Sequence, residues 1–418
     1  MYDLIYESGS LCDPLNKVMT TSSFKYDVCI VGGAGRVGLP LGLCLAQAGN
    51  RVMLHDVNEN VLSMLNRGKM PFLDEGAEQI LNAVLDKTLD TGTSIETVAQ
   101  SKFIVFVIGT GIDEHLTPRL NDFLSAFERL LPLLSDRQHV ILRSTVFPGT
   151  TEVIKGYFES RGLQPRLSYC PERIAQGKAV YELRHLPQII GTFDEDSRKE
   201  AAGLFSSLTP DLIFLTPFEA ELTKLFTNTW RYIEFAIANQ LYQIAAKNKV
   251  DFYRLYQAIT YNYPRAAGFP SAGFSAGPCL FKDTMQLTEF STGSFFLGHA
   301  AMMINDGMPN FIVETLKNRH RLKELTVGIL GMAFKANNDD KRESLSYKLK
   351  RILEIEAKRV YCTDPYISDP EFVPVEECIR TSDILIVGAP HSHYRSLDIP
   401  AEKEIADIWN FYGKGGLF

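Results

Sequence analysis

Short runs of apolar residues, each bounded by glycine or polar residues, recur along most of the chain. In the first third, the segments 27–31, 103–108 and 139–142 are apolar almost throughout, with helix-like stretches between them. Continuous apolar runs of this length are typical of strands buried on both faces of a parallel sheet. Similar runs at 325–331 and 384–387 predict a second βαβ sheet. The predicted fold class is α/β, with two Rossmann-like, doubly wound parallel-sheet domains joined by a helical middle.

One long helix is predicted over residues 219–247, which contain neither glycine nor proline. At 1.5 Å per residue it would be roughly 40 Å long. Its apolar residues form more than one stripe, so we expect it to be buried on several sides, as a spine between domains or a dimer interface. Four polar residues share one face at spacings of three and four, and such groups on a buried helix need partners or a ligand. They are Glu221, Lys224, Asn228 and Arg231. The alternative is a solvated stripe with a Glu221–Lys224 ion pair.

The length of 418 residues suggests about three domains. We expect an N-terminal arm over residues 1–24 and a nucleotide-binding domain over 25–216. A central helical domain over 217–322 would follow, and then a second Rossmann-like domain over 323–418.

The composition, 45% apolar and 22% charged, is typical of a soluble globular protein. A net charge of -7 argues against nucleic acid or an anionic membrane as the main partner. No apolar run approaches the ~20 residues that cross a bilayer, and the first 24 residues lack the apolar core of a secretion signal. The seven cysteines lack the spacing of a zinc site or a disulfide framework. We therefore expect no metal site, and reduced thiols in the cytoplasm.

A dinucleotide fingerprint follows the first predicted strand. It reads Gly33-Ala34-Gly35-Arg36-Val37-Gly38 and leads directly into a predicted helix. In such a turn the first glycine permits the bend, the second lets the backbone approach a pyrophosphate, and the third lets helix and strand pack closely. The helix N-terminus then faces the phosphates. Asp56 ends the next strand, where a carboxylate accepts ribose hydroxyls and repels a 2′-phosphate, so NAD is favoured over NADP.

Hydroxyl side chains stand at the ends of the next predicted strands. Thr110 follows the strand 103–108, and Ser144 and Thr145 follow 139–142. Ligands of open α/β sheets lie beyond the carboxyl ends of the strands, so these residues are candidates to line the cofactor or the reacting carbon. Each of them, Ser144 above all, could instead be a helix cap.

A lone cysteine stands close to a lysine and an aspartate, at Cys279, Lys282 and Asp283, after a loop punctuated by glycine and proline. A thiolate is a strong nucleophile and can hold an acyl group as a thioester. If Cys279 does this beside a nicotinamide, an alcohol can be oxidised to an acid. If the cysteine is only structural, the chain is at most a two-electron dehydrogenase.

Two further charged segments are candidates for ligand contacts. Lys335 and Arg342 follow a strand of the second sheet and would suit a diphosphate or a sugar, since arginine can grip oxygens bidentately; a structural lid is the alternative. Glu172 and Arg173 form a compact turn after a strand, which alone could be an ordinary loop salt bridge.

Together these motifs resemble those of the nucleotide-sugar 6-dehydrogenases, from about Lys25 to the end of the chain. The motifs that carry the resemblance are the glycine fingerprint with Asp56, residues 144–151 (STVFPGTT), Pro171-Glu172-Arg173, Glu221-x-x-Lys224-x-x-x-Asn228, the Cys279–Asp283 block, and Phe334-Lys335 with Asp340-x-Arg342-Glu343-Ser344.

The resemblance implies a four-electron oxidation of the C6 hydroxyl of a UDP-sugar with NAD. Cys279 would add to the aldehyde, the thiohemiacetal would be oxidised to a thioester, and water would release a uronic acid. The resemblance implies that Lys224 and Asn228 stabilise the C6 oxyanion, and that Asp283 and Thr145 position water or relay a proton. It implies thioester hydrolysis for Glu172 and a cofactor contact for Lys282. Lys335 and Arg342 would bind the substrate.

Within the family, three stretches look more like the UDP-N-acetylhexosamine branch than the UDP-glucose branch. They are Pro171-Glu172-Arg173, Asn228-Thr229-Trp230-Arg231 and Tyr263-Pro264-Arg265. This likeness adds Arg173, Arg231 and Arg265 as substrate-binding residues, with Arg265 crossing the seam of a homodimer built on the long helix.

The chain departs from the family pattern around the cysteine. The departures are Ala276 for a usual glycine, Pro278 for histidine or serine, Phe281 for proline, and Gln176 where the UDP-glucose branch has glutamate. Proline restricts its own φ and that of the preceding residue, so Pro278 could change the approach of the thiol. These changes bear on which sugar is used.

Three alternatives stay open at this point. The chain could be a UDP-glucose 6-dehydrogenase, since no residue fixes the configuration of the sugar or an N-acetyl group. It could be a two-electron NAD-dependent hydroxyacid or alcohol dehydrogenase with a structural Cys279. It could also be a nucleotide-sugar-binding protein without turnover.

Overall fold

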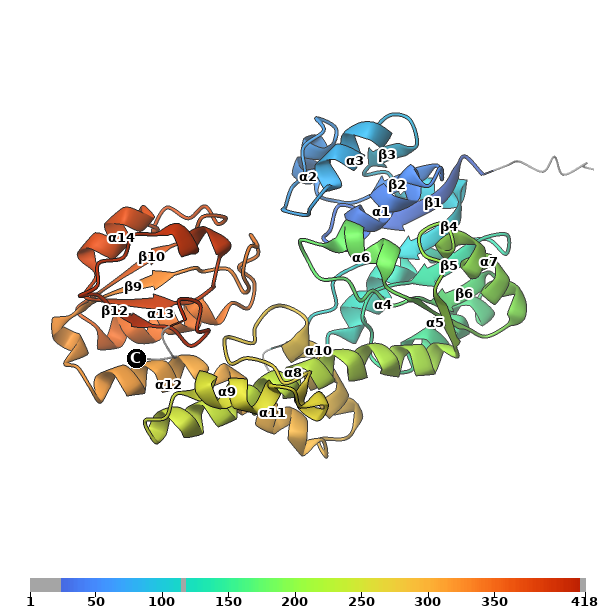
Figure 1. Ribbon diagram of the computed structural model, residues 1–418. Helices are drawn as coiled ribbons and strands as arrows, with labels where there is room; N and C mark the ends of the chain where they lie inside the picture. Colours follow the sequence, from blue (N-terminus) through green and yellow to red (C-terminus); the bar gives the residue numbers. More distant parts are fainter. Residues whose placement is uncertain (1–23, 114–117, 414–418) are drawn as a thin grey trace, which may run out of the picture.

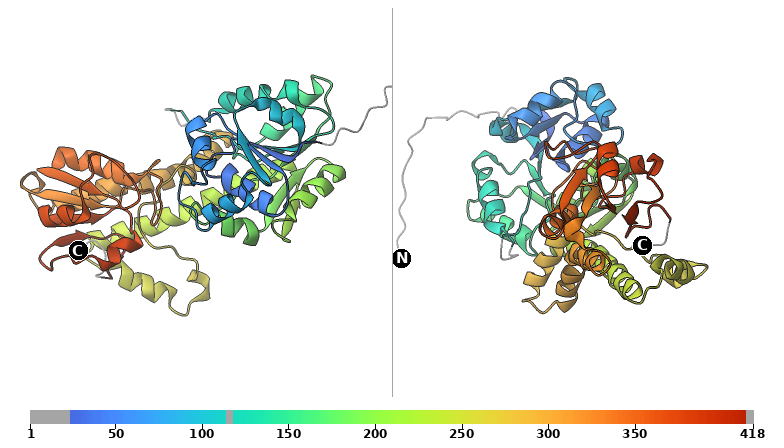
Figure 2. Two further views of the ribbon diagram at one scale, coloured as in Figure 1. Left: turned by 90° about the horizontal axis from the view of Figure 1, so that it is seen from above. Right: turned by 90° about the vertical axis from the view of Figure 1, so that its left-hand side faces the viewer.

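The computed structural model describes residues 24–113 and 118–413. Of the predicted N-terminal arm, every residue except Phe24 lies outside the described ranges. Two α/β lobes, each built on its own sheet, sit side by side above a layer of helices (Figure 1). The views in Figure 2 place the lobes toward opposite ends of that layer, with the long helix running between them.

The sheet of the first lobe has eight strands in the order β3-β2-β1-β4-β5-β6-β7-β8. They are β1 Tyr26–Val31, β2 Val52–His55, β3 Leu89–Gly92, β4 Ser101–Phe106, β5 His139–Leu142, β6 Arg166–Tyr169, β7 Gln188–Thr192 and β8 Leu212–Leu215. The expected parallel sheet is confirmed from β3 to β6. The pairing of β6 with β7 is antiparallel, and β8 runs parallel to β7. The apolar pattern carries no signal for this reversal, because a buried strand looks the same in either direction.

Helices cover both faces of this sheet, which explains the continuous apolar runs. Along β1, Val28 and Ile30 face a core shared with α1, whereas Cys29 and Val31 face a core shared with α4 and α5. The helices of the lobe are α1 Gly38–Gln47, α2 Glu59–Leu65, α3 Ala77–Val84, α4 Leu120–Glu128, α5 Thr150–Glu159, α6 Ala179–His185 and α7 Glu195–Phe205, with short 3₁₀ turns η1 Ile95–Gln100 and η2 Leu131–Leu133.

The middle layer is built on α8, which runs from Pro217 to Lys247 and confirms the predicted long helix. Thr216 and Glu219 form a reciprocal capping box around Pro217, so the start of the helix is fixed by local sequence. The helices α10 and α11 pack on α8. The helices that follow it are α9 Phe252–Thr260, α10 Leu280–Phe290, α11 Phe296–Asp306 and α12 Met308–Lys317, with η3 Pro264–Ala266 before the cysteine.

Burial of α8 on several sides, as expected from its apolar stripes, is only partly correct. One side packs in the chain, but large apolar residues on another side are exposed, among them Trp230 at 61%. No helix in the described ranges is both long and apolar enough to cross a membrane.

The second lobe has a four-stranded parallel sheet in the order β10-β9-β11-β12. Its elements are β9 Thr326–Leu330, α13 Leu345–Glu356, β10 Arg359–Thr363, α14 Val375–Thr381, β11 Ile384–Val387 and β12 Glu404–Ala406, with η4 Leu322–Glu324 and η5 Ser392–Ser396. A loop over residues 331–344 separates β9 from α13 and reaches back to the first lobe.

Candidate active site

The glycine turn after β1 has the shape that a pyrophosphate requires. A Cβ on Gly33 would lie 2.8 Å from the Ile30 carbonyl oxygen, and one on Gly38 would lie 2.6 Å from the Gly32 oxygen, so both positions are closed by backbone. A Cβ on Gly35 would meet only the Gly32 oxygen, at 3.4 Å. The backbone beside Gly35 is therefore open to a ligand, while the other two glycines hold the turn.

Gly32 was missed by the sequence reading, although it is the most constrained glycine of the turn. Its φ is +85°, and a Cβ there would lie 2.1 Å from the Val107 carbonyl oxygen. It precedes the Gly-x-Gly-x-x-Gly pattern, so the motif gave no reason to single it out.

Asp56 lies beside this turn. Its Oδ2 accepts a hydrogen bond from the Ala34 amide at 3.0 Å, and its Oδ1 accepts one from the Asn58 amide at 3.0 Å. The carboxylate is thereby fixed at the end of β2 and stays partly exposed, as ribose recognition would need. Val37 caps the start of α1 through its backbone, and Arg36 turns toward the second lobe, where it pairs with Asp339.

The hydroxyls at the strand ends behave differently from one another. The Ser144 Oγ donates to the Ile108 carbonyl at 2.7 Å and accepts from its amide at 2.9 Å, so this buried residue ties β5 to the end of β4. It does not cap α5, whose N-cap is Gly149. Thr110 donates to the Thr145 carbonyl at 2.5 Å and lies 3.4 Å from the Lys282 Nζ. Thr110 thus meets the cysteine segment at Lys282 and is tied to the Thr145 backbone, whereas Ser144 is held between β4 and β5.

Cys279 lies at the N-cap of α10. Gly277 has a φ of +104° and packs so closely on the Phe334 ring that a Cβ would lie 2.6 Å from it, which seats the cysteine loop against the second lobe. Among the described cysteines Cys279 alone is exposed. Surrounding protein nevertheless desolvates the thiol and raises its pKa, and Asp283 raises it further; Lys282, Lys224 and Arg342 act in the opposite direction.

A buried polar cluster lies beside this thiol. Asp283 has no exposed surface and accepts hydrogen bonds from the Asn228 Nδ2 and the Lys282 Nζ, each at 2.5 Å. Burial lowers the pKa of Lys224, while Asp283, Cys279 and Glu172 act to raise it. The structure therefore brings Cys279, Lys224, Asn228 and Asp283 together. A buried ammonium and an amide donor beside a thiol can stabilise an oxyanion formed there.

Glu221 does not belong to this cluster, and it does not pair with Lys224. Its oxygens accept from the Gly149 amide at 2.6 Å, and from the Thr151 amide and Oγ1 at 2.8 and 2.5 Å. Burial raises its pKa against these hydrogen bonds. Glu221 thus holds the N-terminus of α5 against α8, and the solvated-stripe alternative is wrong for this residue.

Glu172 is anchored by Arg143, a partner that the sequence reading missed. The Nε and Nη2 atoms of Arg143 donate to the Glu172 Oε2 at 3.0 and 2.5 Å, and the Arg143 side chain is fully buried. The only sequence signal was a charge directly after the apolar strand 139–142. The compact turn is indeed a salt bridge, but its cation is Arg143. Arg173 instead donates to the Pro187 carbonyl, and burial lowers its pKa.

The remaining predicted ligand residues fall into two groups. Lys335 donates to the Gln176 carbonyl at 2.6 Å, and its pKa is lowered by burial and by the nearby charge of Arg231. The Arg342 Nη2 lies 2.7 Å from the Asp340 Oδ2, and the charge of Cys279 acts to raise the pKa of Arg342. Arg265 stacks on Tyr263 in its own exposed loop. Lys335 thus lies near Arg231 of α8 and contacts the first lobe at Gln176, whereas Arg342 lies near the thiol. Arg265 stays in its own loop.

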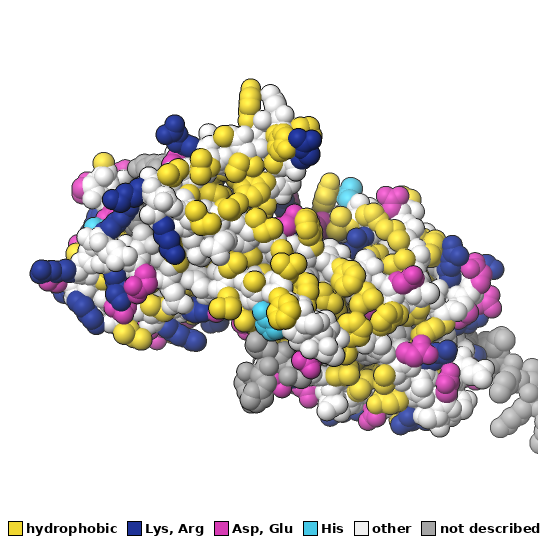
Figure 3. All heavy atoms as spheres, turned by 90° about the horizontal axis from the view of Figure 1, so that it is seen from below, with side chains coloured by type: hydrophobic (Ala, Val, Ile, Leu, Met, Phe, Trp, Pro, Cys, Tyr) yellow, Lys and Arg dark blue, Asp and Glu magenta, His cyan; other side chains and the backbone are white. Residues whose placement is uncertain are grey.

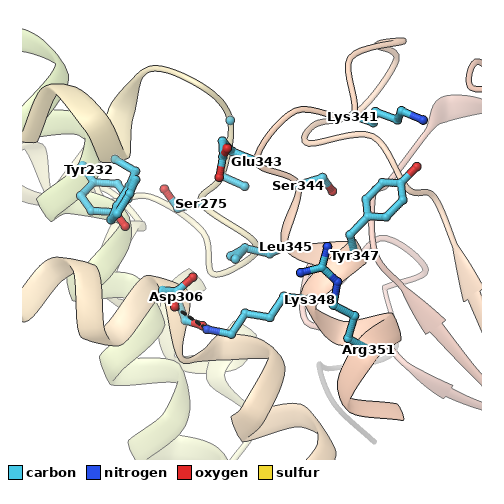
Figure 4. Close-up of a pocket in the computed structure, with 13 residues that line it drawn as sticks. Tyr232, Ser275, Asp306, Lys341, Glu343, Ser344, Leu345, Tyr347, Lys348 and Arg351 are labelled. Atoms are coloured by element: carbon cyan, nitrogen blue, oxygen red, sulfur yellow. Dashed lines mark hydrogen bonds and ion pairs between the residues drawn. The ribbon is translucent and has the colours of Figure 1, made fainter. Parts of the chain in front are cut away.

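A cleft of about 630 Å³ opens against the cysteine loop from the side of α13 (Figure 4). Ser275, Ala276 and Gly277 form part of its wall, and Lys348 reaches across to Asp306 of α11. None of the predicted lysine and arginine ligands lines it. Its walls come from four separate segments, which is why no sequence motif indicated it.

Three family domains match almost the whole chain. Residues 26–209 match the NAD binding domain of the UDP-glucose/GDP-mannose dehydrogenase family, residues 218–306 its central domain, and residues 328–414 its UDP binding domain.

Two curated relatives and two solved structures are similar over most of their length. The UDP-N-acetyl-D-mannosamine dehydrogenase of Methanocaldococcus jannaschii is 28% identical over 91% of this chain and 89% of its own. The NDP-N-acetyl-D-galactosaminuronic acid dehydrogenase of Ralstonia solanacearum is 24% identical over 88% and 92%. The structure of the UDP-D-ManNAc dehydrogenase of Pyrococcus horikoshii has a TM-score of 0.85 at 25% identity, covering 92% and 95%. That of a UDP-glucose dehydrogenase of Pyrobaculum islandicum has a TM-score of 0.84 at 26% identity, covering 93% and 95%.

Proposed function

The chain belongs to the UDP-glucose/GDP-mannose dehydrogenase family and is an NAD-dependent oxidoreductase of UDP-sugars, and we propose that it oxidises the C6 hydroxyl of its sugar through to the acid on Cys279. The resemblance seen in the sequence, the fold class and NAD as cofactor are thereby confirmed. The observation that carries the proposal is Cys279, the exposed cysteine of the described ranges, beside Lys224, Asn228 and Asp283.

The cofactor would be held by the open backbone at Gly35, by Asp56, and by Thr110 and Lys282, whose side chains lie 3.4 Å apart. When bound, NAD accepts one hydride in each of the two oxidation steps. We assign Ser144 and Val37 to the framework of this site, and Arg36 to its border with the second lobe.

In the proposed chemistry, the C6 hydroxyl loses its proton as the alcohol is oxidised to the aldehyde. The Cys279 sulfur then adds to the aldehyde carbon, and Lys224 and Asn228 stabilise the negative charge on its oxygen. A second two-electron oxidation removes the hydrogen on that carbon and leaves a thioester. Water attacks the thioester carbon, the carbon–sulfur bond breaks, and the carboxylate and free thiol are released.

Two groups of residues serve the proton and water steps of this proposal. Asp283, fixed between Asn228 and Lys282, is placed to relay protons to and from Lys224, whose pKa is lowered by burial. Glu172, held by Arg143, and Thr145 would orient the hydrolytic water. Lys335, Arg231 and Arg342 would bind the nucleotide sugar, with Arg173 shaping the same turn.

The stoichiometry of the reaction tests this mechanism. Two NADH per sugar consumed are expected from the unaltered chain, and one NADH would sink the acid-forming mechanism. In Cys279→Ala the acid should not form, with turnover falling by at least about a thousandfold. Activity retained in Cys279→Ala would favour the two-electron alternative with a structural cysteine. Tight UDP-sugar binding without any NADH release would favour a binding protein.

We propose that the sugar is a UDP-N-acetylhexosamine, with UDP-N-acetyl-D-mannosamine as the first candidate. Relatives with that printed activity match this chain over about nine-tenths of its length. The Asn228–Arg231 and Tyr263–Arg265 stretches point to the same branch. The competing substrate is UDP-glucose. NADH release measured across a panel of UDP-hexoses and UDP-N-acetylhexosamines separates them, and preference for UDP-glucose would contradict the proposal.

We further propose a cytoplasmic homodimer formed through α8, with the four-part division of the chain at residues 24, 216 and 322. The exposed side of α8 carries Phe226, Trp230, Ile237, Leu241 and Ile244. Hydrophobic side chains gather across this face of the molecule (Figure 3). A second copy would cover them and bring its Arg265 toward the cleft of the first.

Mixed dimers test this assignment of Arg265. If Arg265 acts across the interface, Cys279→Ala and Arg265→Ala subunits are each inactive alone, yet mixing them restores one intact site per heterodimer. If Arg265 acts within its own chain, no activity returns. Leu241→Asp should yield monomers in light scattering, and an unchanged dimer would contradict the α8 interface.

A further inference from the structure

Arg36, in the glycine turn, is joined to the second lobe by an ion network. Its Nη1 lies 2.8 Å from the Asp339 Oδ1, its Nε lies 3.6 Å from the Asp340 Oδ2, and its guanidinium stacks 4.8 Å above the Phe72 ring. The second oxygen of Asp339 accepts from the Leu73 amide at 3.0 Å. We propose that Arg36 and Asp339 form an interdomain latch, which seats the 331–344 loop on the nucleotide turn and positions Arg342 beside Cys279.

The latch continues from Asp340 to Arg342. The Arg342 Nε and Nη2 donate to the two Asp340 oxygens at 3.0 and 2.7 Å, and the Arg342 amide donates to Oδ1 at 3.0 Å. Asp340 is 3% exposed. Burial would raise its pKa, but Arg342 and Arg36 outweigh burial and lower it. Asp340 is therefore ionised and held by arginines from both lobes.

Arg342, at the end of this network, carries a positive charge that favours the thiolate of Cys279. Arg342 lowers the pKa of Cys279 against desolvation, and the charge of Cys279 in turn raises that of Arg342. The 331–344 loop also contacts the cysteine loop directly, because the Gly277 amide donates to the Glu343 carbonyl at 3.4 Å and Gly277 packs on the Phe334 ring. Ion pairs and hydrogen bonds thus run from the glycine turn through Asp340 to Arg342, and the loop that carries them packs against the cysteine loop.

The latch is compatible with an occupied cofactor site. A guanidinium has five N–H donors, and within the described ranges the Arg36 side chain donates a hydrogen bond from Nη1 alone, to Asp339. Arg36 follows Gly35, whose outer side is open. The free N–H groups can therefore meet a phosphate oxygen while Nη1 stays on Asp339, so that cofactor binding and the latch reinforce each other. This step rests on the proposed place of NAD at the turn.

Asp339→Asn is the decisive variant, because it removes the charge and keeps the size and the acceptor for the Leu73 amide. We expect the KM for NAD to rise about tenfold with little change in kcat. We also expect the pH at which iodoacetamide alkylates Cys279 half-maximally to rise, a shift that a merely structural role would not cause. Added KCl should raise the KM for NAD in the unaltered chain more than in the variant.

The matched control is Asp27→Asn, which removes a carboxylate paired with Arg51 at 3.1 Å near the start of β1, away from the cleft. It should leave both the KM for NAD and the alkylation profile unchanged. Arg36→Gln removes the other charge of the latch, and with it the contact to Asp340. It should shift the alkylation profile in the same direction as Asp339→Asn.

An Asp339→Asn protein that melts like the unaltered chain and keeps both its KM for NAD and its alkylation profile overturns the latch. If the variant unfolds, Arg36→Gln decides, because an unchanged alkylation profile in a folded Arg36→Gln protein also overturns the latch. Cys279 alkylation needs no turnover. The latch can therefore fail while the proposed oxidation holds, and the reverse outcome is equally visible.

Discussion

The two lobes share one backbone frame but use it in opposite ways. In the first lobe the Gly32 amide donates to the His55 carbonyl across to β2; in the second, the Gly331 amide donates to the Thr363 carbonyl across to β10, each at 2.9 Å. Each second strand then ends at an aspartate, Asp56 or Asp364, whose Oδ2 accepts amides of the adjacent glycine turn.

The two aspartates differ in exposure and in the number of hydrogen bonds that each already accepts. Asp56 accepts one amide from the turn and stays partly exposed. Asp364 accepts four backbone amides and the His391 Nε2, and both side chains are fully buried. In the first lobe α1 begins directly after the turn, whereas the loop 331–344 intervenes before α13. A dinucleotide site thus needs an open carboxylate next to an open glycine, and the second lobe has closed both.

The shared frame predicts the largest effect. Gly32 and Gly331 have φ values of +85° and +93°, and a Cβ on them would lie 2.1 Å from the Val107 carbonyl oxygen and 2.4 Å from the Ala389 carbonyl oxygen, respectively. Either change to alanine should cost at least about 4 kcal/mol, seen as loss of soluble protein or of cooperative thermal unfolding. Gly49→Ala is the control, since its φ is +97° but nothing lies within 4 Å; it should cost about 1 kcal/mol. A well-tolerated Gly331→Ala would break the equivalence of the two turns.

The next largest effect is a difference in stability between the asparagine variants of the two aspartates. Asp364→Asn breaks a saturated buried network, so we expect a loss of about 3 kcal/mol in the free energy of unfolding. Asp56→Asn leaves an exposed oxygen in contact with water and should cost less than about 1 kcal/mol. Urea unfolding of the two variants measures both values. Equal losses would show that Asp364 is no more structural than Asp56.

The same network predicts how acid affects the second lobe. Burial would raise the pKa of Asp364, but the His391 hydrogen bond and the backbone amides outweigh burial and lower it. The stabilisation from Asp364 is therefore complete above its ordinary pKa and is lost as pH falls through the lowered value. Asp364→Asn should accordingly show a flatter fall in stability below about pH 4 than the unaltered chain. Parallel acid curves would contradict this assignment.

The features that the sequence alone could indicate are local ones. The glycine fingerprint, the acid at the end of the next strand and the cysteine block each occupy a few neighbouring positions, and the long helix carries its own capping box. The sequence alone did not indicate contacts between residues far apart in the chain. Arg36 and Asp339 are separated by 303 positions, Arg143 and Glu172 by 29, and His391 and Asp364 by 27. Long-range pairs of charged residues have no periodicity to detect, so only the folded chain reveals them.

Substitutions in the two lobes should affect the two ligands separately, the first lobe NAD and the second lobe the UDP-sugar. Asp56→Asn is expected to raise the KM for NAD about thirtyfold, as for loss of a hydrogen bond to a charged group, and to leave the KM for the UDP-sugar unchanged. Lys335→Met should do the reverse, because Lys335 stands on the 331–344 loop and donates to the Gln176 carbonyl of the first lobe. Steady-state kinetics with each substrate varied in turn measures both. A variant that raises both constants would show that the lobes do not divide the ligands in this way.

The smallest effect is expected from Gly35→Ala, which probes the open side of the glycine turn. A methyl group on Gly35 meets only the Gly32 oxygen, at 3.4 Å, so Gly35→Ala should fold and melt almost as the unaltered chain does. It would occupy the space through which a pyrophosphate approaches the backbone, and we expect about a tenfold loss of NAD affinity, measured by calorimetry. Asp364 has no such open neighbour, since the amides of Met332 and Ala333 both point to it. Unchanged NAD affinity in a folded Gly35→Ala protein would mean that the open turn is not what distinguishes the first lobe from the second.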